Sequence, residues 1–203
     1  MTGTATRVQS MEQAARKERV LEAAARLFSE RRFDEVSMEE IAQRAEVGKG
    51  TLYTYFADKE ELYFAVVFDG IKRLNESLQT GATGPDDPEE RLRHMVYCIV
   101  SFFSQNRYFF RLMSIEDGRS EDGKGDSRRR WHEERRVQLE AIETVLRNGQ
   151  RAGVFRISHP AIEAHILRDM VRTVMVNTRD LELTVAEIVD IILRVFLTGI
   201  RAA

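Results

Sequence analysis

Apolar residues recur along almost the whole chain with the period of an α-helix. The clearest stripe runs from Val20 through Ala24 to Phe28, positions four residues apart that share one helical face. No stretch alternates apolar and polar residues as a half-buried strand does. The pattern therefore predicts an all-α protein. The expected helices cover residues 11–31, 38–45, 49–56, 58–79, 88–105, 107–115, 127–151, 160–178 and 185–200.

Three of these helices have recognisable start signals. Ser37 with Glu40, and Asp58 with Glu61, form capping-box patterns in which each partner satisfies a free backbone N–H of the first turn. Pro88 stands at a first helical position, where its missing N–H is harmless. Glycine-containing breaks are expected at 80–87 and at 116–127, the second as a mobile loop.

A short helix, a tight turn and a second short helix follow one another between residues 37 and 56, which is the length of a helix-turn-helix. At about 100° per residue, Leu52 and Phe56 share the face that points to the core. Gly50 and Thr54 lie on the opposite face, so the outward side of the second helix is small and polar.

This outward face suits the major groove of duplex DNA. Thr51 also belongs to it, and small residues let a helix backbone approach base edges. Tyr53 and Tyr55 flank the face, where their hydroxyls can reach the phosphate walls. Lys49 can meet a phosphate or a guanine edge, and Lys59 opens the next helix, whose free N–H groups favour phosphate. The alternative is a helical interaction or scaffold protein in which the same helix only packs.

Charge does not decide between these interpretations. The formal net charge of the 203 residues is −2, which neither requires nor excludes a local basic face. Arg31 and Arg32 lie near the helix-turn-helix, but Glu39 and Glu40 oppose them. If the segment binds DNA, the acidic residues of its first helix must face away from the phosphates.

Composition limits the classes of protein to which the chain can belong. Apolar residues make up 43% of the chain and charged residues 32%, which allows a packed core. The single cysteine, Cys98, excludes an intramolecular disulfide and fits a reducing cytosol. No leader pattern and no apolar stretch of membrane-spanning length is present, so a cytoplasmic protein without membrane contact is expected.

Enzyme signatures are missing. The chain has no Gly-x-Ser-x-Gly, no His-Glu-x-x-His and no strand-linked phosphate loop, so no catalytic residue and no cofactor is expected. His94 and Cys98 stand four residues apart, which is a possible spacing for two metal ligands. No third ligand can be assigned, and we expect no metal site.

Residues 36–62 carry a more specific signal, the register Gly50-x-Leu52-Tyr53-x-x-Phe56-x-x-Lys59-x-x-Leu62. This register resembles the N-terminal DNA-binding domain of the tetracycline-repressor (TetR) family. The resemblance extends from the first expected helix into the fourth.

The chain departs from the family pattern at two positions of the turn. At the first, members of the family usually carry Gly and this chain has Glu46. The second helix of the helix-turn-helix, expected at residues 49–56 and called the reading helix below, often begins with Ser in the family. This chain has Gly48 there, which can still cap the helix at a small cost. Glu46 places a charge near the DNA, where it would weaken binding or select a base such as cytosine. Beyond this domain, only the helix layout and the turn at Gly153 are similar to the family.

The resemblance implies a homodimeric transcriptional regulator, usually a repressor released from its operator by a small molecule. It implies a three-helix DNA-binding domain over 10–57 and a larger helical domain over 58–203 that binds the effector and dimerises. The family's DNA contacts would fall on Ser37, Lys49, Gly50, Thr51, Tyr53, Thr54, Tyr55 and Lys59.

Two further surfaces are expected in the C-terminal domain. The broad apolar faces of the last two helices favour a dimer interface over a purely internal core, and a two-fold dimer implies a pseudo-palindromic operator. The interface residues would be Ile166, Met170, Val174, Ile188, Ile192, Val195 and Phe196. Most residues of the aromatic cluster are expected in the core, but some can line a cavity for an apolar or aromatic effector such as a drug, a dye or a fatty acyl compound. The candidates are Cys98, Phe102, Asn106, Met113, Trp131 and His132.

Overall fold

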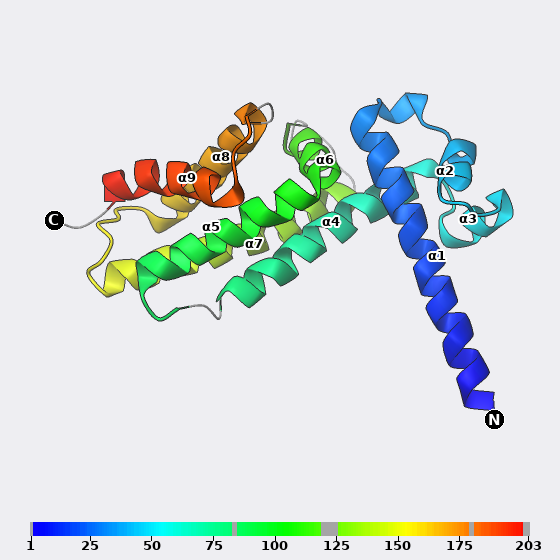
Figure 1. The fold of residues 1–203 in the computed structure, drawn as a ribbon, viewed down its shortest axis with the longest axis horizontal. Helices are drawn as coiled ribbons and strands as arrows, with labels where there is room; N and C mark the ends of the chain where they lie inside the picture. The colour runs from blue at the N-terminus through cyan, green and yellow to red at the C-terminus, as the bar shows by residue number, and fades with distance from the viewer. Residues whose placement is uncertain (1, 83–84, 119–125, 179–180, 201–203) are drawn as a thin grey trace. The chain divides into compact units, whose positions relative to one another are not determined.

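The computed structural model describes residues 2–82, 85–118, 126–178 and 181–200, and over these ranges the protein is helical without a β-strand (Figure 1). The all-α prediction is therefore confirmed. The elements are α1 (Thr2–Glu30), the 3₁₀ helix η1 (Phe33–Glu35), α2 (Met38–Arg44), α3 (Lys49–Tyr55), α4 (Lys59–Ala82), α5 (Pro88–Gln105), α6 (Arg107–Gly118), α7 (Asp126–Arg151), α8 (Pro160–Asn177) and α9 (Val185–Ile200).

The N-cap bond of each predicted capping box is present, but the return bond is not, because the Glu40 carboxylate pairs with Arg31 and the Glu61 carboxylate accepts from the Ala57 N–H. The Ser37 hydroxyl accepts from the Glu40 N–H at 3.2 Å, and the Asp58 carboxylate accepts from the Glu61 N–H at 2.8 Å. The expected breaks fall partly on residues 83–84 and 119–125, which lie outside the described residues. Next to the second break, helix α6 continues to Gly118, so residues 116–118, which were expected in the loop, are helical.

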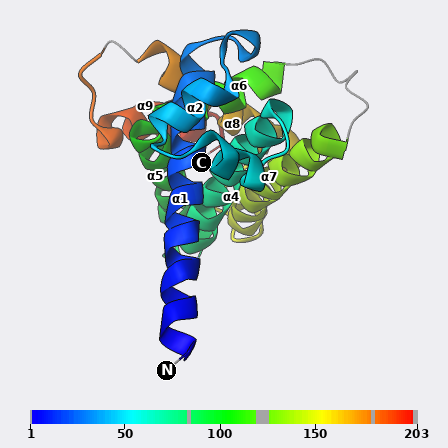
Figure 2. The same ribbon diagram turned by 90° about the vertical axis from the view of Figure 1, so that its right-hand side faces the viewer.

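The first helix differs most from expectation, because α1 begins at Thr2 and not near residue 11 (Figure 2). No proline interrupts its polar first half, and residues such as Glu12 and Arg16 are good helix formers that pair across one turn at 3.5 Å. The apolar stripe that marks a buried helix begins only at Val20, so hydrophobic periodicity missed the exposed part.

The chain forms two compact units, and the first contains the residues up to Gly70 together with α6. Its helix α1 packs against α2 and α6, and α2 packs against α3. A buried hydrogen bond joins α4 to α6, because the Tyr63 hydroxyl donates to the Glu116 carboxylate at 2.5 Å. Gly70 lies so close to the ring of Phe109 that a side chain there would overlap it. These contacts hold α6 in the unit that contains the helix-turn-helix.

The second unit contains residues Ile71 to Asn106 and the helices from α7 onward. Helix α5 packs against α7 and α9, and α8 packs against α7 and α9 (Figure 1). Leu92, Leu146 and Ile192 are fully buried in its core. Helix α4 is shared, since its residues up to Gly70 belong to the first unit and those from Ile71 to the second. Within the described ranges, no helix combines the length and apolarity that crossing a bilayer requires.

Candidate nucleic-acid interface

The turn between α2 and α3 is built by a left-handed residue. Glu46 has a φ of 55°, its N–H donates to the Gln43 carbonyl, and the Val47 N–H donates to the Ala42 carbonyl. This pair of bonds is a Schellman motif, whose left-handed position normally holds glycine. Gly48 then caps α3 without a side-chain hydrogen bond. Glu46, which stands where the family usually has Gly, thus adopts a backbone conformation that favours glycine.

Helix α3 presents the face that periodicity predicted. Leu52 and Phe56 are buried, whereas Gly50, Tyr53 and Thr54 are exposed. A Cβ at Gly50 would meet nothing within 4 Å, so no internal packing requires glycine there. The outward side of α3 is therefore small, polar and open.

The two predicted flanking phenols differ in their surroundings. Tyr53 is 44% exposed, whereas Tyr55 is half-buried and its hydroxyl lies 3.5 Å from the Gln13 carbonyl of α1. Beside it, the Lys17 ammonium lies 5.7 Å from the centre of the Phe56 ring. Half-buried Thr51 accepts at its carbonyl from the Thr54 hydroxyl at 2.6 Å. Helix α1 therefore supports the C-terminal end of α3.

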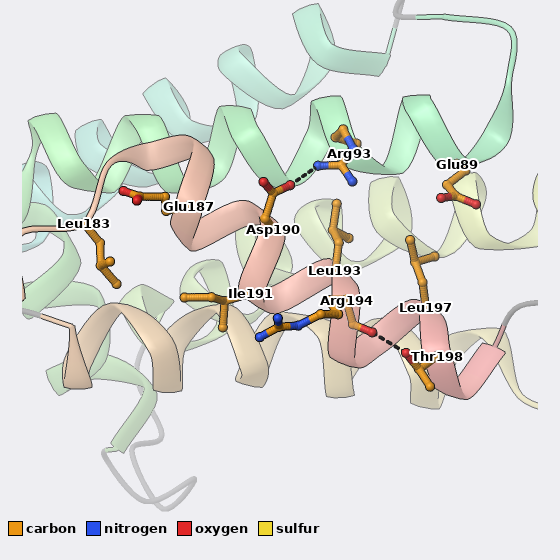
Figure 3. Close-up of a pocket in the computed structure, with 10 residues that line it drawn as sticks. All are labelled: Glu89, Arg93, Leu183, Glu187, Asp190, Ile191, Leu193, Arg194, Leu197 and Thr198. Atoms are coloured by element: carbon orange, nitrogen blue, oxygen red, sulfur yellow. Dashed lines mark hydrogen bonds and ion pairs between the residues drawn. The ribbon is translucent and has the colours of Figure 1, made fainter.

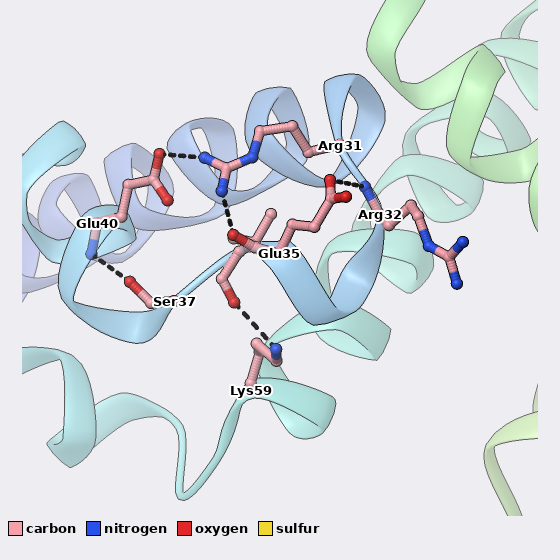
Figure 4. Close-up of polar contacts among 7 residues, drawn as sticks. Arg31, Arg32, Glu35, Ser37, Glu40 and Lys59 are labelled. Atoms are coloured by element: carbon pink, nitrogen blue, oxygen red, sulfur yellow. Dashed lines mark hydrogen bonds and ion pairs between the residues drawn. The ribbon is translucent and has the colours of Figure 1, made fainter.

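Charged side chains beside α3 have partners within the protein. The Lys49 ammonium donates to the Glu39 carboxylate of α2, and this hydrogen bond lowers the pKa of Glu39 and raises the pKa of Lys49. Arg31 and Glu40 form a second ion pair at 2.6 Å (Figure 4). Glu40 thus turns toward α1, but Glu39 does not face away from the reading helix.

Lys59 makes contacts that sequence reasoning did not anticipate. Its ammonium donates to the backbone carbonyls of Phe33 at 2.8 Å and Val36 at 2.9 Å, and it lies 4.4 Å from the centre of the Phe33 ring. These bonds tie the start of α4 to the segment that leads into Ser37. The exposed Ser37 hydroxyl is itself engaged as the cap of α2.

The six residues predicted for an effector site are divided between the two units. Met113 is buried in the first unit, whereas the others belong to the second, where Trp131 is buried and His132 is exposed. The Asn106 amide donates to the Phe102 carbonyl at 2.8 Å and so ends α5. Half-buried Cys98 has a pKa raised by burial, and its Sγ lies 3.8 Å from Nε2 of His94. Within the described ranges, no three acidic, His or Cys side chains gather as metal ligands.

Two buried amides were not anticipated. Asn75 of α4 donates to Glu134 at 3.1 Å, and Gln138 of α7 accepts from Arg135. In the described part of the chain, Oδ1 of Asn75 and Nε2 of Gln138 have no hydrogen-bond partner. Glu134, the partner of Asn75, lies one helical turn before Gln138 on α7. The one feature of the sequence that could have indicated them is an amide residue within an otherwise apolar stripe of a helix.

A separate groove of about 570 Å³ lies along α5 and α9 (Figure 3). Its lining includes the ion pair of Arg93 and Asp190, at 2.5 Å, together with apolar residues such as Leu197. The predicted effector residues do not line it.

The predicted dimer residues fall into three groups, which are buried, exposed and half-buried. Ile188, Ile192 and Phe196 are buried within the single chain, so they belong to its own core and not to a surface for a second copy. Ile166 is 48% and Val195 60% exposed. Met170 and Val174 are half-buried, and the prediction missed exposed Ile162 and Val176 of α8.

These features define a helix-turn-helix protein with a separate helical unit, and comparison with known proteins identifies its family. Residues 20–66 match the model of bacterial regulatory proteins of the tetR family. Residues 85–200, more than half of the chain, match the tetracyclin repressor-like C-terminal domain. The chain therefore belongs to the TetR family.

Individual relatives agree with this assignment. The chain is 32% identical over 102 residues to the transcriptional activator FasR of Mycolicibacterium smegmatis, covering 50% of this chain and 47% of that protein. It is 32% identical over 84 residues to the transcriptional repressor KstR of the same species, covering 41% of each. The chain thus spans less than half the length of these two relatives, which include both an activator and a repressor.

Among solved structures, a regulator from Clostridium perfringens that is named for fatty acid metabolism is similar over most of its length. Its TM-score is 0.78 at 26% identity, with 91% of this chain and all of that chain covered.

Proposed function

We propose that the protein is a transcriptional regulator that binds duplex DNA through α3, placed in the major groove of a pseudo-palindromic operator. The observation that carries the proposal is the outward face of α3, where exposed Gly50 and Thr54 leave room for base edges. Tyr53 and Tyr55 contact the phosphate walls, and Thr51 adds a hydroxyl to the reading face. Lys49 contacts a phosphate or a guanine edge.

Two further contacts rest on the family pattern. Ser37 caps α2, and Lys59 is the first residue of α4, the helix that follows α3. Because both are already bonded within the protein, they contribute to DNA binding chiefly by holding α2 and α4 in place. Lys59 therefore supports DNA binding more by positioning α4 than by contacting a phosphate.

The regulator acts as a homodimer, so that two copies of α3 read half-sites about one DNA turn apart. Exposed apolar side chains on α8 and α9 support a second copy as the partner of this surface. They are Ile162, Ile166, Val176 and Val195. A single copy exposes such residues at the cost of leaving apolar area in water.

The regulator is a repressor while it is bound to its operator. An apolar effector, of which a fatty acyl compound is an example, releases it from the operator. The name of the structural relative from Clostridium perfringens supports this effector class. The unpaired atoms of Asn75 and Gln138 can hydrogen-bond a carboxyl or amide group, and Trp131 lies one helical turn before Arg135 on the same helix. Helix α4 carries the signal, because it contributes residues to both units.

The test is retention of DNA from a random duplex pool at low ionic strength. The proposal predicts enrichment of a two-fold symmetric sequence and salt-dependent affinity, and Tyr55→Ala should weaken retention. A helical scaffold protein would retain no duplex. Trp131 is the single tryptophan, so its fluorescence should change when decanoic acid or decanoyl-CoA binds, and Asn75→Leu should reduce that change.

A further inference from the structure

The ion pair between α2 and α3 occupies the one lysine of the reading helix. The sequence of α3 is KGTLYTY, so Lys49 is its single cation. Its ammonium donates to the Glu39 carboxylate and lies 6.0 Å from the centre of the Tyr53 ring. Both charged side chains are more than half exposed, so the pair lies on the surface and not in the core.

Neighbouring cations are also engaged within the protein. Arg31 holds Glu40 at 2.6 Å (Figure 4), and the Lys59 ammonium is bonded to two backbone carbonyls. Attraction to phosphates is the sequence-independent part of DNA binding, and it depends on cations that displace counterions. Because these three cations are partnered by carboxylates and carbonyls, they attract arbitrary duplex DNA less than free cations would.

We propose that Glu39 is a specificity-determining residue, because its carboxylate holds Lys49 until a DNA site offers partners to both members of the ion pair. This inference rests on the proposed function. A phosphate can take the ammonium, but it repels the carboxylate that is released. A G·C pair in the major groove can satisfy both, since guanine O6 and N7 accept from a lysine and the cytosine amino group donates to a carboxylate.

The consequence is an asymmetry between sites. On arbitrary DNA, contact between Lys49 and a phosphate requires the ion pair to open without compensation for Glu39. On the operator, both groups exchange one partner for another. Glu39 therefore lowers the affinity for arbitrary DNA more than the affinity for the operator, and so widens the ratio between them.

The test compares Glu39→Gln with wild type by fluorescence anisotropy on two duplexes, the best one selected from a random pool and a shuffled version of the same composition. Glu39→Gln should bind the shuffled duplex about three- to fivefold more tightly, the scale of one exposed ion pair. It should bind the selected duplex no more tightly than wild type. Binding to the shuffled duplex should also become steeper in salt, by about one counterion.

Glu60→Gln is the matched control, because it removes the same charge from an exposed position of the same unit and leaves the ion pair in place. Its effect should be similar on the two duplexes. In a Lys49→Met background, Glu39→Gln should change the specificity ratio no more than Glu60→Gln does. Circular dichroism confirms that each variant is folded, and Glu39→Asp, which keeps the charge, should retain most of the wild-type ratio.

Several outcomes would overturn the inference while leaving the proposed function intact. These are an equal gain on both duplexes, no gain on either, or the same change in ratio when Lys49 is absent. If wild type binds no duplex at low ionic strength, the proposed function itself fails.

Discussion

The substitution Gly50→Ala separates the demands of folding from those of DNA binding. Gly50 is exposed on α3, and an added Cβ would meet no protein atom within 4 Å. Helices prefer alanine to glycine by about 0.5–1 kcal/mol, because glycine loses more backbone entropy on folding. We therefore expect the free energy of unfolding to rise by up to that amount, and the melting temperature to rise by about 1–4 °C.

DNA affinity should change in the opposite direction. If the α3 backbone approaches base edges at Gly50, a methyl group intrudes into a close-packed contact. Overpacking of this kind costs about 1–3 kcal/mol, which corresponds to a roughly five- to 150-fold loss of affinity. A more stable but weaker-binding variant is difficult to explain by any effect on folding.

The assay pairs differential scanning fluorimetry with anisotropy on the selected duplex. Gly118→Ala is the control, since Gly118 is also exposed, belongs to the same unit and has no atom near its Cβ position. It should leave DNA affinity unchanged. If Gly50→Ala stabilises the protein and binds DNA as tightly as wild type, α3 does not approach the bases as proposed.

Three further predictions test the local geometry. Glu46→Gly should raise the free energy of unfolding by about 1 kcal/mol, because the left-handed conformation at φ 55° disfavours a side chain; an unchanged or lower denaturation midpoint in urea would contradict this. Tyr63→Phe should lower the same free energy by about 1–3 kcal/mol, because buried Glu116 loses a donor, and a neutral result would mean that the bond contributes nothing. Burial raises the pKa of Cys98, so iodoacetamide should alkylate it more slowly at pH 8 than it alkylates free cysteine, and faster as the pH rises; labelling at the rate of free cysteine would show an accessible thiolate.

Much of the fold follows from periodicity and caps. The stripe from Val20 to Phe28 and the cap at Ser37 fix helices within a few residues, because burial and free N–H groups constrain them locally. The orientation of α3 follows in the same way, from Leu52 and Phe56. Hydrophobic periodicity cannot predict a helix that has no apolar face. For this reason the exposed start of α1 was missed.

The partners of polar side chains were less predictable. Glu39 and Lys49 lie ten residues apart on either side of a turn, and only the path of that turn brings them together. Lys59 reaches two carbonyls that carry no signal in the sequence. Apolar periodicity also indicates that Ile192 is buried without telling which chain covers it, so a core residue was assigned to the dimer interface.

The most direct test of the central claim is methylation interference on the selected operator. Dimethyl sulfate modifies guanine N7 in the major groove and adenine N3 in the minor groove. With α3 in the major groove of two half-sites, guanine N7 methylation should block binding at two clusters about 10 base pairs apart. Interference confined to adenine N3, or to a single cluster, would contradict the account.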